Sequence, residues 1–130
     1  MTGMIWRTGG LATVLLTLVL GGVRADDVKP TDEGNGAEFR GKKIEMKDKD
    51  QVAILLSFAA GKEFEATTDG TKDTDVHLFV YDESGKVVGK DDSSGPKCSV
   101  KFTPTKDGKF KFLIKNMKGD NTVAFEVKVK

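Results

Sequence analysis

The sequence predicts an all-β fold, an antiparallel sandwich or barrel built from several short strands. From residue 51 to residue 130, apolar residues recur at every second position, which is the period of a strand that buries one face. Short segments rich in Gly, Asp, Asn and Ser separate these runs, and such residues suit tight turns. Helical spacing fits none of the runs well.

The first 25 residues have the features of a secretory signal peptide. Arg7 precedes an apolar run from Leu11 to Leu20, and a small residue, Ala25, follows at a suitable cleavage position. The apolar run is shorter than the roughly 20 residues that a membrane span needs. We therefore expect cleavage after Ala25, a secreted or periplasmic protein, and no membrane span after processing.

Composition limits the classes of function. Loss of Arg7 and Arg24 reduces the 21 basic residues to 19, against 20 acidic ones, so the processed chain lacks the basic excess of a general nucleic-acid binder. Cys98 is the single cysteine, so no intrachain disulfide can form. About a hundred residues suffice for one domain with one core, and we expect a monomer.

The elements follow in order along the chain. Residues 26–43 are acidic at the start and rich in turn formers, which predicts a flexible lead, and residues 44–130 are expected to form the sandwich domain. Asp73–Gly95 is predicted to be a hairpin with acidic loops at its ends. The side chains predicted to face the core are Val52, Ile54, Leu56, Phe58, Phe64, Ala66, Val76, Leu78, Val80, Cys98, Val100, Phe102, Phe110, Phe112, Ile114, Val123, Phe125, Val127 and Val129.

Several of these runs together resemble a known family. The stretches are "DTDVHLFVYDESGKVV", "DDSSG", "CSVKFTPTKDGKFKFLIKN" and "VAFEVKV". They resemble the bacterial pre-peptidase C-terminal domain, in the small stand-alone secreted form of planctomycete-like bacteria. The resemblance implies a jelly-roll-like β-sandwich of about seven to nine short strands. It carries over no assigned activity, since such domains usually follow the catalytic domain of a secreted peptidase and only a signal peptide and a lead are expected here.

The residues do not favour an enzyme. A Ser-His-Asp arrangement would need His77 as its base, yet His77 falls inside a predicted strand. No "GxSxG" or "HExxH" motif is present, and a single histidine excludes a multi-histidine zinc site. We predict a protein without catalytic residues.

Four carboxylates form the candidate metal site: Asp73, Asp75, Asp91 and Asp92. If their two loops meet at one end of the sandwich, the oxygens could hold calcium, which takes six to eight hard ligands; some relatives of the resembled family bind calcium. The spacing is not that of an EF-hand. The alternative is that these residues cap turns by accepting backbone N–H bonds.

His77, Phe79 and Tyr81 share the strand face opposite to the core. An outward aromatic stripe is typical of a contact surface for a partner chain or a sugar, although the lead or a long loop could equally cover it. The chain has no tryptophan after Trp6, which disfavours sugar stacking.

The sequence thus predicts a secreted, non-enzymatic binding or accessory module whose partner is an exported protein or an extracellular polymer. The alternatives are a calcium-stabilised module that binds such a polymer, and a structural component of the cell envelope. No other cofactor is expected.

Overall fold

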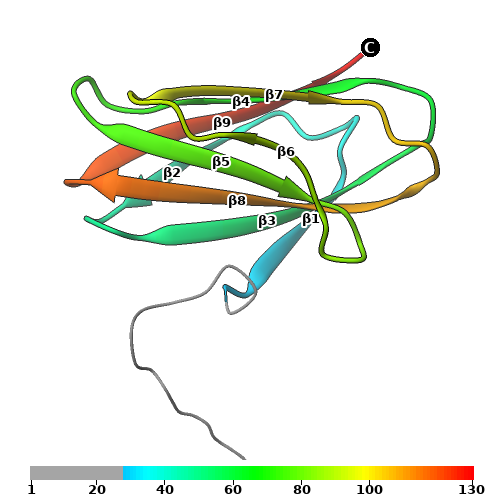
Figure 1. Cartoon of the computed structure of the whole chain (residues 1–130), viewed down its shortest axis with the longest axis horizontal. Helices are drawn as coiled ribbons and strands as arrows, with labels where there is room; N and C mark the ends of the chain where they lie inside the picture. The colour runs from blue at the N-terminus through cyan, green and yellow to red at the C-terminus, as the bar shows by residue number, and fades with distance from the viewer. Residues whose placement is uncertain (1–27) are drawn as a thin grey trace, which may run out of the picture.

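Two stacked β-sheets form the protein in this computed structural model, which describes residues 28–130 (Figure 1). Within that range the chain forms no helix long and apolar enough to cross a membrane. The nine strands of the described range are β1 (Pro30–Asn35), β2 (Lys42–Met46), β3 (Gln51–Phe58), β4 (Phe64–Asp69), β5 (Asp75–Tyr81), β6 (Val87–Asp91), β7 (Lys97–Phe102), β8 (Gly108–Lys118) and β9 (Asn121–Val129).

The sheets have five and four strands. Sheet A has the order β1-β3-β8-β5-β6, and sheet B has the order β2-β9-β4-β7. Every pairing is antiparallel except that of β1 with β3, which is parallel. The predicted all-β sandwich is therefore confirmed, and so is the hairpin, because β5 and β6 pair around the turn at residues 82–86.

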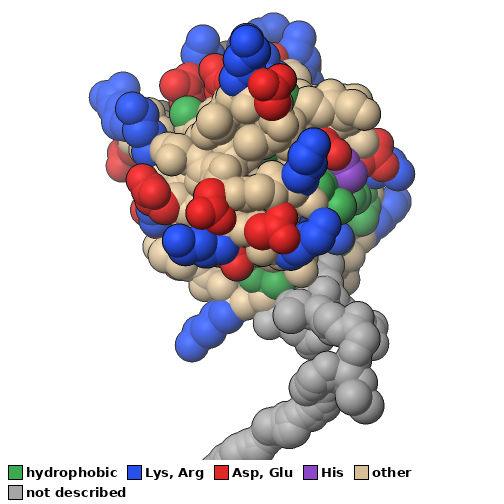
Figure 2. Space-filling view, turned by 90° about the vertical axis from the view of Figure 1, so that its left-hand side faces the viewer, with side chains coloured by type: hydrophobic (Ala, Val, Ile, Leu, Met, Phe, Trp, Pro, Cys, Tyr) green, Lys and Arg blue, Asp and Glu red, His purple; other side chains and the backbone are tan. Residues whose placement is uncertain are grey.

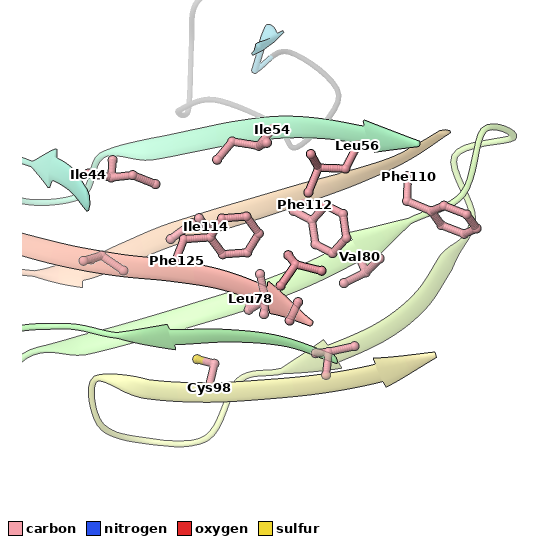
Figure 3. Close-up of a cluster of buried hydrophobic side chains, with 14 of the residues drawn as sticks. Ile44, Ile54, Leu56, Leu78, Val80, Cys98, Phe110, Phe112, Ile114 and Phe125 are labelled. Carbon is pink, nitrogen blue, oxygen red and sulfur yellow. The ribbon is translucent and has the colours of Figure 1, made fainter. Parts of the chain in front are cut away.

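The core lies between the sheets and follows the predicted period of two (Figure 3). Along β5 the burial alternates strictly, with Val76, Leu78 and Val80 fully buried. Aromatic rings join the layers, since Phe58 of sheet A stacks on Phe64 of sheet B with ring centroids 4.2 Å apart. Val52, Phe102 and Val129 differ from the other predicted core residues, because they are only partly buried and pack against the core from its rim.

The segment expected to be a flexible lead contains structure. Residues 30–35 form β1, and β2 begins at Lys42. None of the six side chains of β1 is buried, so apolar periodicity could not predict this strand. Strand β1 is held by backbone pairing to the edge of β3. Just after β1, the Gly36 N–H donates a further hydrogen bond to the Ser57 carbonyl of β3 at 2.7 Å. The predicted signal peptide, residues 1–25, lies outside the described residues.

Two buried asparagines organise the loops at the end where β8 finishes. Asn116 donates from Nδ2 to the Lys47 carbonyl at 2.8 Å. Asn121 donates to the Asn116 side-chain oxygen at 3.1 Å and accepts from the Thr71 N–H at 2.7 Å. Each buried amide therefore has partners, as buried polar groups require, and three loops are tied together.

The sandwich is closed along the edge where β6 approaches β7. The Ser99 N–H of β7 donates to Asp91 of β6 at 2.9 Å. Further along, a Cβ built at Gly89 would lie 2.4 Å from Val100 Cγ1. Because real Cβ contacts are not this short, the two strands can approach only with glycine at this position.

We expect Gly89→Ala to lower the free energy of unfolding by about 1–3 kcal/mol, the usual cost of overpacking. Urea unfolding followed by circular dichroism measures it. The double variant Gly89→Ala/Val100→Ala should lose less than the sum of the two single changes, since removal of Val100 Cγ1 relieves the clash. Additive losses would show that the close approach does not constrain the fold.

Candidate functional site

The outer faces of the two sheets differ in chemistry. On sheet B, Glu65 lies between Lys101 and Lys128 on the neighbouring strands, and Asp69 lies opposite Lys97. Such opposite-charge neighbours are typical of a solvated sheet face. The residues of sheet B that face outward, taken from its paired strands, are Lys43, Glu45, Glu65, Thr67, Asp69, Lys97, Ser99, Lys101, Thr122, Ala124, Glu126 and Lys128.

The outer face of sheet A has an apolar centre. Leu113 of β8 lies between Ala53 of β3 and Phe79 of β5 in one register row. Leu55 and Tyr81 flank Lys111 in the next row. Leu113 is 0% exposed and Ala53 is 2% exposed, whereas Leu55, Phe79 and Tyr81 are half-buried. We call Ala53, Leu55, His77, Phe79, Tyr81 and Leu113 the sheet A face.

Two lysines of β8 lie over the rings of β5. Lys115 Nζ is 5.1 Å from the centroid of the Phe79 ring, and Lys111 Nζ is 5.1 Å from that of Tyr81. Contacts of this kind contribute about 0.5–1 kcal/mol at exposed sites. They also fix where the two positive charges stand on the face.

His77 lies at one end of the sheet A face. Its Nε2 is 3.5 Å from Asp75 Oδ1, and its side chain is 19% exposed. Its ring contacts Phe79 edge-on, with centroids 6.5 Å apart. The structure thus places the predicted stripe of His77, Phe79 and Tyr81 together on the outward side of β5, as expected.

The four carboxylates of the predicted metal site have different contacts, although Asp75 and Asp91 both lie near His77. Asp91 accepts hydrogen bonds from the Ser93 N–H and hydroxyl at 3.1 and 2.6 Å. Asp75 pairs with His77, and Asp92 lies 3.7 Å from Lys90. Asp73 is exposed in a turn with a φ of 68°.

Among residues 28–130 no group of three or more acidic, His or Cys side chains could hold a metal ion. Asp82 behaves like Asp91, since one oxygen accepts from the Ser84 N–H, the Ser84 hydroxyl and the Lys86 N–H. Hydrogen bonds from Ser84 and Lys86 lower the pKa of Asp82. Asp82 and Asp91 thus accept hydrogen bonds from the N–H groups of their turns, as the turn-capping alternative describes.

Cys98 is buried on the inward side of β7, and its Sγ donates to the Val76 carbonyl at 2.9 Å. Burial raises the pKa of the thiol, and the Asp91 and Asp75 charges raise it further. Since the thiolate is the reactive form, Cys98 is a core residue with low reactivity.

Figure 2 shows the end of the sandwich at which β8 finishes. Acidic and basic side chains are interspersed over most of this view. Hydrophobic side chains gather at one flank, beside the histidine.

The fold and the faces together define a two-layered β-sandwich module. The pre-peptidase C-terminal domain of a collagenase from Bacillus anthracis is similar in structure, with a TM-score of 0.54, 14% identity, and coverage of 78% of this chain and 96% of that one. PliG of Aeromonas hydrophila, a periplasmic inhibitor of g-type lysozyme, is similar at a TM-score of 0.50, 13% identity, and coverage of 77% and 100%. The predicted resemblance to the pre-peptidase C-terminal fold is confirmed. No protein-family profile and no curated protein sequence matches the chain.

The sequence predicted the aromatic stripe but not that Leu55 and Leu113 lie beside it on the same face of sheet A. Leu55 and Leu113 occupy the outward positions of their strands, and each breaks the alternation that identified the core. An apolar residue at a position that the alternation assigns to the solvent side is the sequence signal that could have identified both leucines. The contacts of Lys111 and Lys115 with the rings depend on which strands are neighbours, so the sequence alone could not show them.

We expect Asp91→Asn to lower the free energy of unfolding by about 1 kcal/mol at pH 7. Although burial raises the pKa of Asp91, hydrogen bonds from Ser93 and Ser99 and the nearby His77 lower it more. The charged form is therefore stabilised in the folded state. Its contribution is present above the ordinary carboxyl pKa of about 3.9 and disappears as the pH falls through the lower folded value.

Urea unfolding at pH 7 and at pH 2.5 measures this difference, with the exposed neighbour Asp92→Asn as the matched control. The loss of unfolding free energy caused by Asp91→Asn should be smaller at pH 2.5 than at pH 7. The loss caused by Asp92→Asn should be small at both pH values. An equal loss for Asp91→Asn at both pH values would contradict a role for its charge.

We expect the melting temperature to be the same in 5 mM calcium and in chelator, because Asp91 already uses its oxygens to cap a turn. Differential scanning calorimetry measures the melting temperature. Calcium at about millimolar concentration is used because it occupies even the weak sites of extracellular modules. A rise of several degrees that Asp91→Asn abolishes would establish the calcium site instead.

Proposed function

We propose that the protein is an exported, non-enzymatic β-sandwich module that binds a partner through the sheet A face. The observation that carries this proposal is the contrast between the outer faces. Sheet B presents paired charges, whereas sheet A presents Leu55, Phe79 and Tyr81 around Leu113. Aromatic residues that are ordered on a rigid strand are typical anchors of protein interfaces.

A non-catalytic role is supported by the surroundings of the reactive side chains. His77 is held within strand β5 by its contacts with Asp75 and with the Phe79 ring. Cys98 is buried with a raised pKa. Asp82 and Asp91 are engaged by turn N–H groups. Each candidate group therefore has a structural role.

The comparisons support an accessory role. One similar structure is a domain that belongs to a collagenase, and the other is an inhibitor that acts in the periplasm. Their identities are low, so the common property is the fold. Together with the predicted signal peptide, this fold suits a module that works outside the cytoplasm by contact with another molecule.

We expect the double variant Phe79→Ser/Tyr81→Ser to lose partner binding by at least tenfold while it remains folded. Removing two half-buried rings takes away interface area and two cation–π contacts, at a cost of about 1–3 kcal/mol in stability. The measurement is quantitative affinity capture from the secreted and envelope fractions of the source cells, with urea unfolding in parallel.

Thr67→Ser/Glu126→Gln, on the outer face of sheet B, is the matched control and should capture as well as the wild type. Equal capture by the Phe79→Ser/Tyr81→Ser variant would remove the sheet A face from the function. Tight envelope association without a saturable partner would favour the structural component instead.

A further inference from the structure

We infer that the edge of β3 is a binding site for an extended segment of a partner protein, and that β1 occupies this site until the partner displaces it. The site lies at the edge of sheet A. It is independent of the outer face to which the proposed function is assigned, so the two can be tested separately.

Few contacts other than backbone pairing attach β1 to the sandwich. β1 is the edge strand of sheet A in the described part of the chain (Figure 1), and none of its six side chains is buried. Asp32 pairs with Lys109 at 3.0 Å, and Glu33 pairs with Lys42 at 2.9 Å. Ion pairs with this degree of solvent exposure contribute little to stability. β1 can therefore open at a lower free energy than the whole domain.

The pairing of β1 with β3 is also short and irregular. The first three residues of β1 pair with residues 53–55, and the register then shifts before Asn35. Gly34, inside this shift, has a φ of 84°, which lies outside the range of a strand. Pro30 has no N–H to donate. These features reduce the number of ladder hydrogen bonds that a partner strand must replace.

The strand beneath β1 does not depend on it for order. β3 pairs with β8 along its whole length, and its inward side chains belong to the core. The Ser57 carbonyl points toward β1, since it accepts from the Gly36 N–H. Backbone groups alternate in direction along a strand, so those of Ala53 and Leu55 point the same way. Opening of β1 thus leaves an ordered strand edge, to which extended segments add.

The chain is anchored again directly after β1. Gly36 lies so close to the Phe58 ring that a Cβ at this position would clash. The Phe39 ring packs against the core, with its centroid 5.6 Å from that of Phe125. These contacts hold the segment that leads into β2. β1 can therefore leave the edge of β3 without unfolding the core.

The composition of β1 indicates what a stronger occupant contains. Thr31 belongs to a residue type enriched in strands, whereas the Pro, Asp, Glu, Gly and Asn of β1 belong to depleted types. Asp32 lies opposite Leu55, a half-buried residue on the outward side of β3. A segment with Val, Ile or Thr at these positions pairs better and places an apolar side chain beside Leu55. The partner therefore presents an extended segment rich in β-branched residues.

A second copy of the chain is a weaker occupant. It offers the same β1, so exchange between two copies gains no pairing over the closed monomer. The β1 of the same chain is also present at a higher effective concentration, because it is joined to the domain. A different protein with a better strand does gain pairing, which is what displacement requires.

Hydrogen exchange of the purified exported protein, measured by NMR, tests whether β1 opens. We expect the Leu55 amide, which faces β1, to exchange at least 100-fold faster than the Ile54 amide, which faces β8. Equal exchange rates for the two amides would show that β1 does not open separately from the domain, and the inference would fail.

A ten-residue fluorescein-labelled peptide, alternating Thr and Val between two terminal Lys residues, is the binding probe. Fluorescence anisotropy measures its affinity for Asp32→Cys/Leu55→Cys, in which oxidation ties together two residues that pair in the register. We expect the oxidised form to bind the probe at least tenfold more weakly than the reduced form, its matched control. A probe with Pro at its two central positions should bind neither form, since proline cannot donate to the ladder.

A single substitution should tighten binding instead. Asp32→Ala removes the ion pair with Lys109, so it should bind the Thr and Val probe at least threefold more tightly than the wild type does. Glu126→Ala, on the outer face of sheet B, is the matched control and should bind like the wild type. Equal affinities for all three proteins would contradict displacement of β1.

The remaining outcomes overturn the inference in distinguishable ways. Equal binding by the oxidised and reduced forms would place the probe away from the β3 edge. A tenfold loss in Phe79→Ser/Tyr81→Ser would assign the probe to the sheet A face and leave the proposed function standing. Absence of binding to the reduced form would show that β1 only protects the edge from aggregation.

Discussion

Packing of phenylalanine rings across the two sheets is the interaction on which the rest of the structure depends. Phe64 of sheet B contacts Phe58 and Phe112 of sheet A, with ring centroids 4.2 and 5.6 Å apart. Phe112 in turn lies 5.5 Å from Phe125 of sheet B. With its one cysteine buried and free, the described domain relies on apolar burial and ring packing to hold its layers together.

This packing determines what the outside of sheet A can present. Because Phe110, Phe112 and Ile114 of β8 face inward, the residues between them must face outward. The order β3-β8-β5 then places Leu113 beside Phe79. A strand buried on its inner side and apolar at the middle of its outer side makes a rigid support, so a ligand would meet an ordered surface with little conformational cost.

Periodicity predicted β3, β4, β5, β7, β8 and β9, whose side chains enter the core, and the turn residues between them predicted the hairpin of β5 and β6. It did not predict β2, although Ile44 and Met46 of that strand are buried. It could not predict β1, because backbone hydrogen bonds to β3 hold this strand while its side chains remain unburied. The buried amides of Asn116 and Asn121 were also invisible, since their partners are distant in the sequence. For the candidate site, the sequence identified the aromatic side chains but could not show that Lys111 and Lys115 lie over their rings.

Site-specific photo-crosslinking in the source cells tests the central claim most directly. A photoreactive amino acid replaces Phe79 in one variant and Thr67, on the outer face of sheet B, in the other. A saturable adduct with one exported protein at position 79, and none at position 67, is the result that the account predicts. Adducts of equal yield at both positions, or an adduct at position 67 alone, would contradict it.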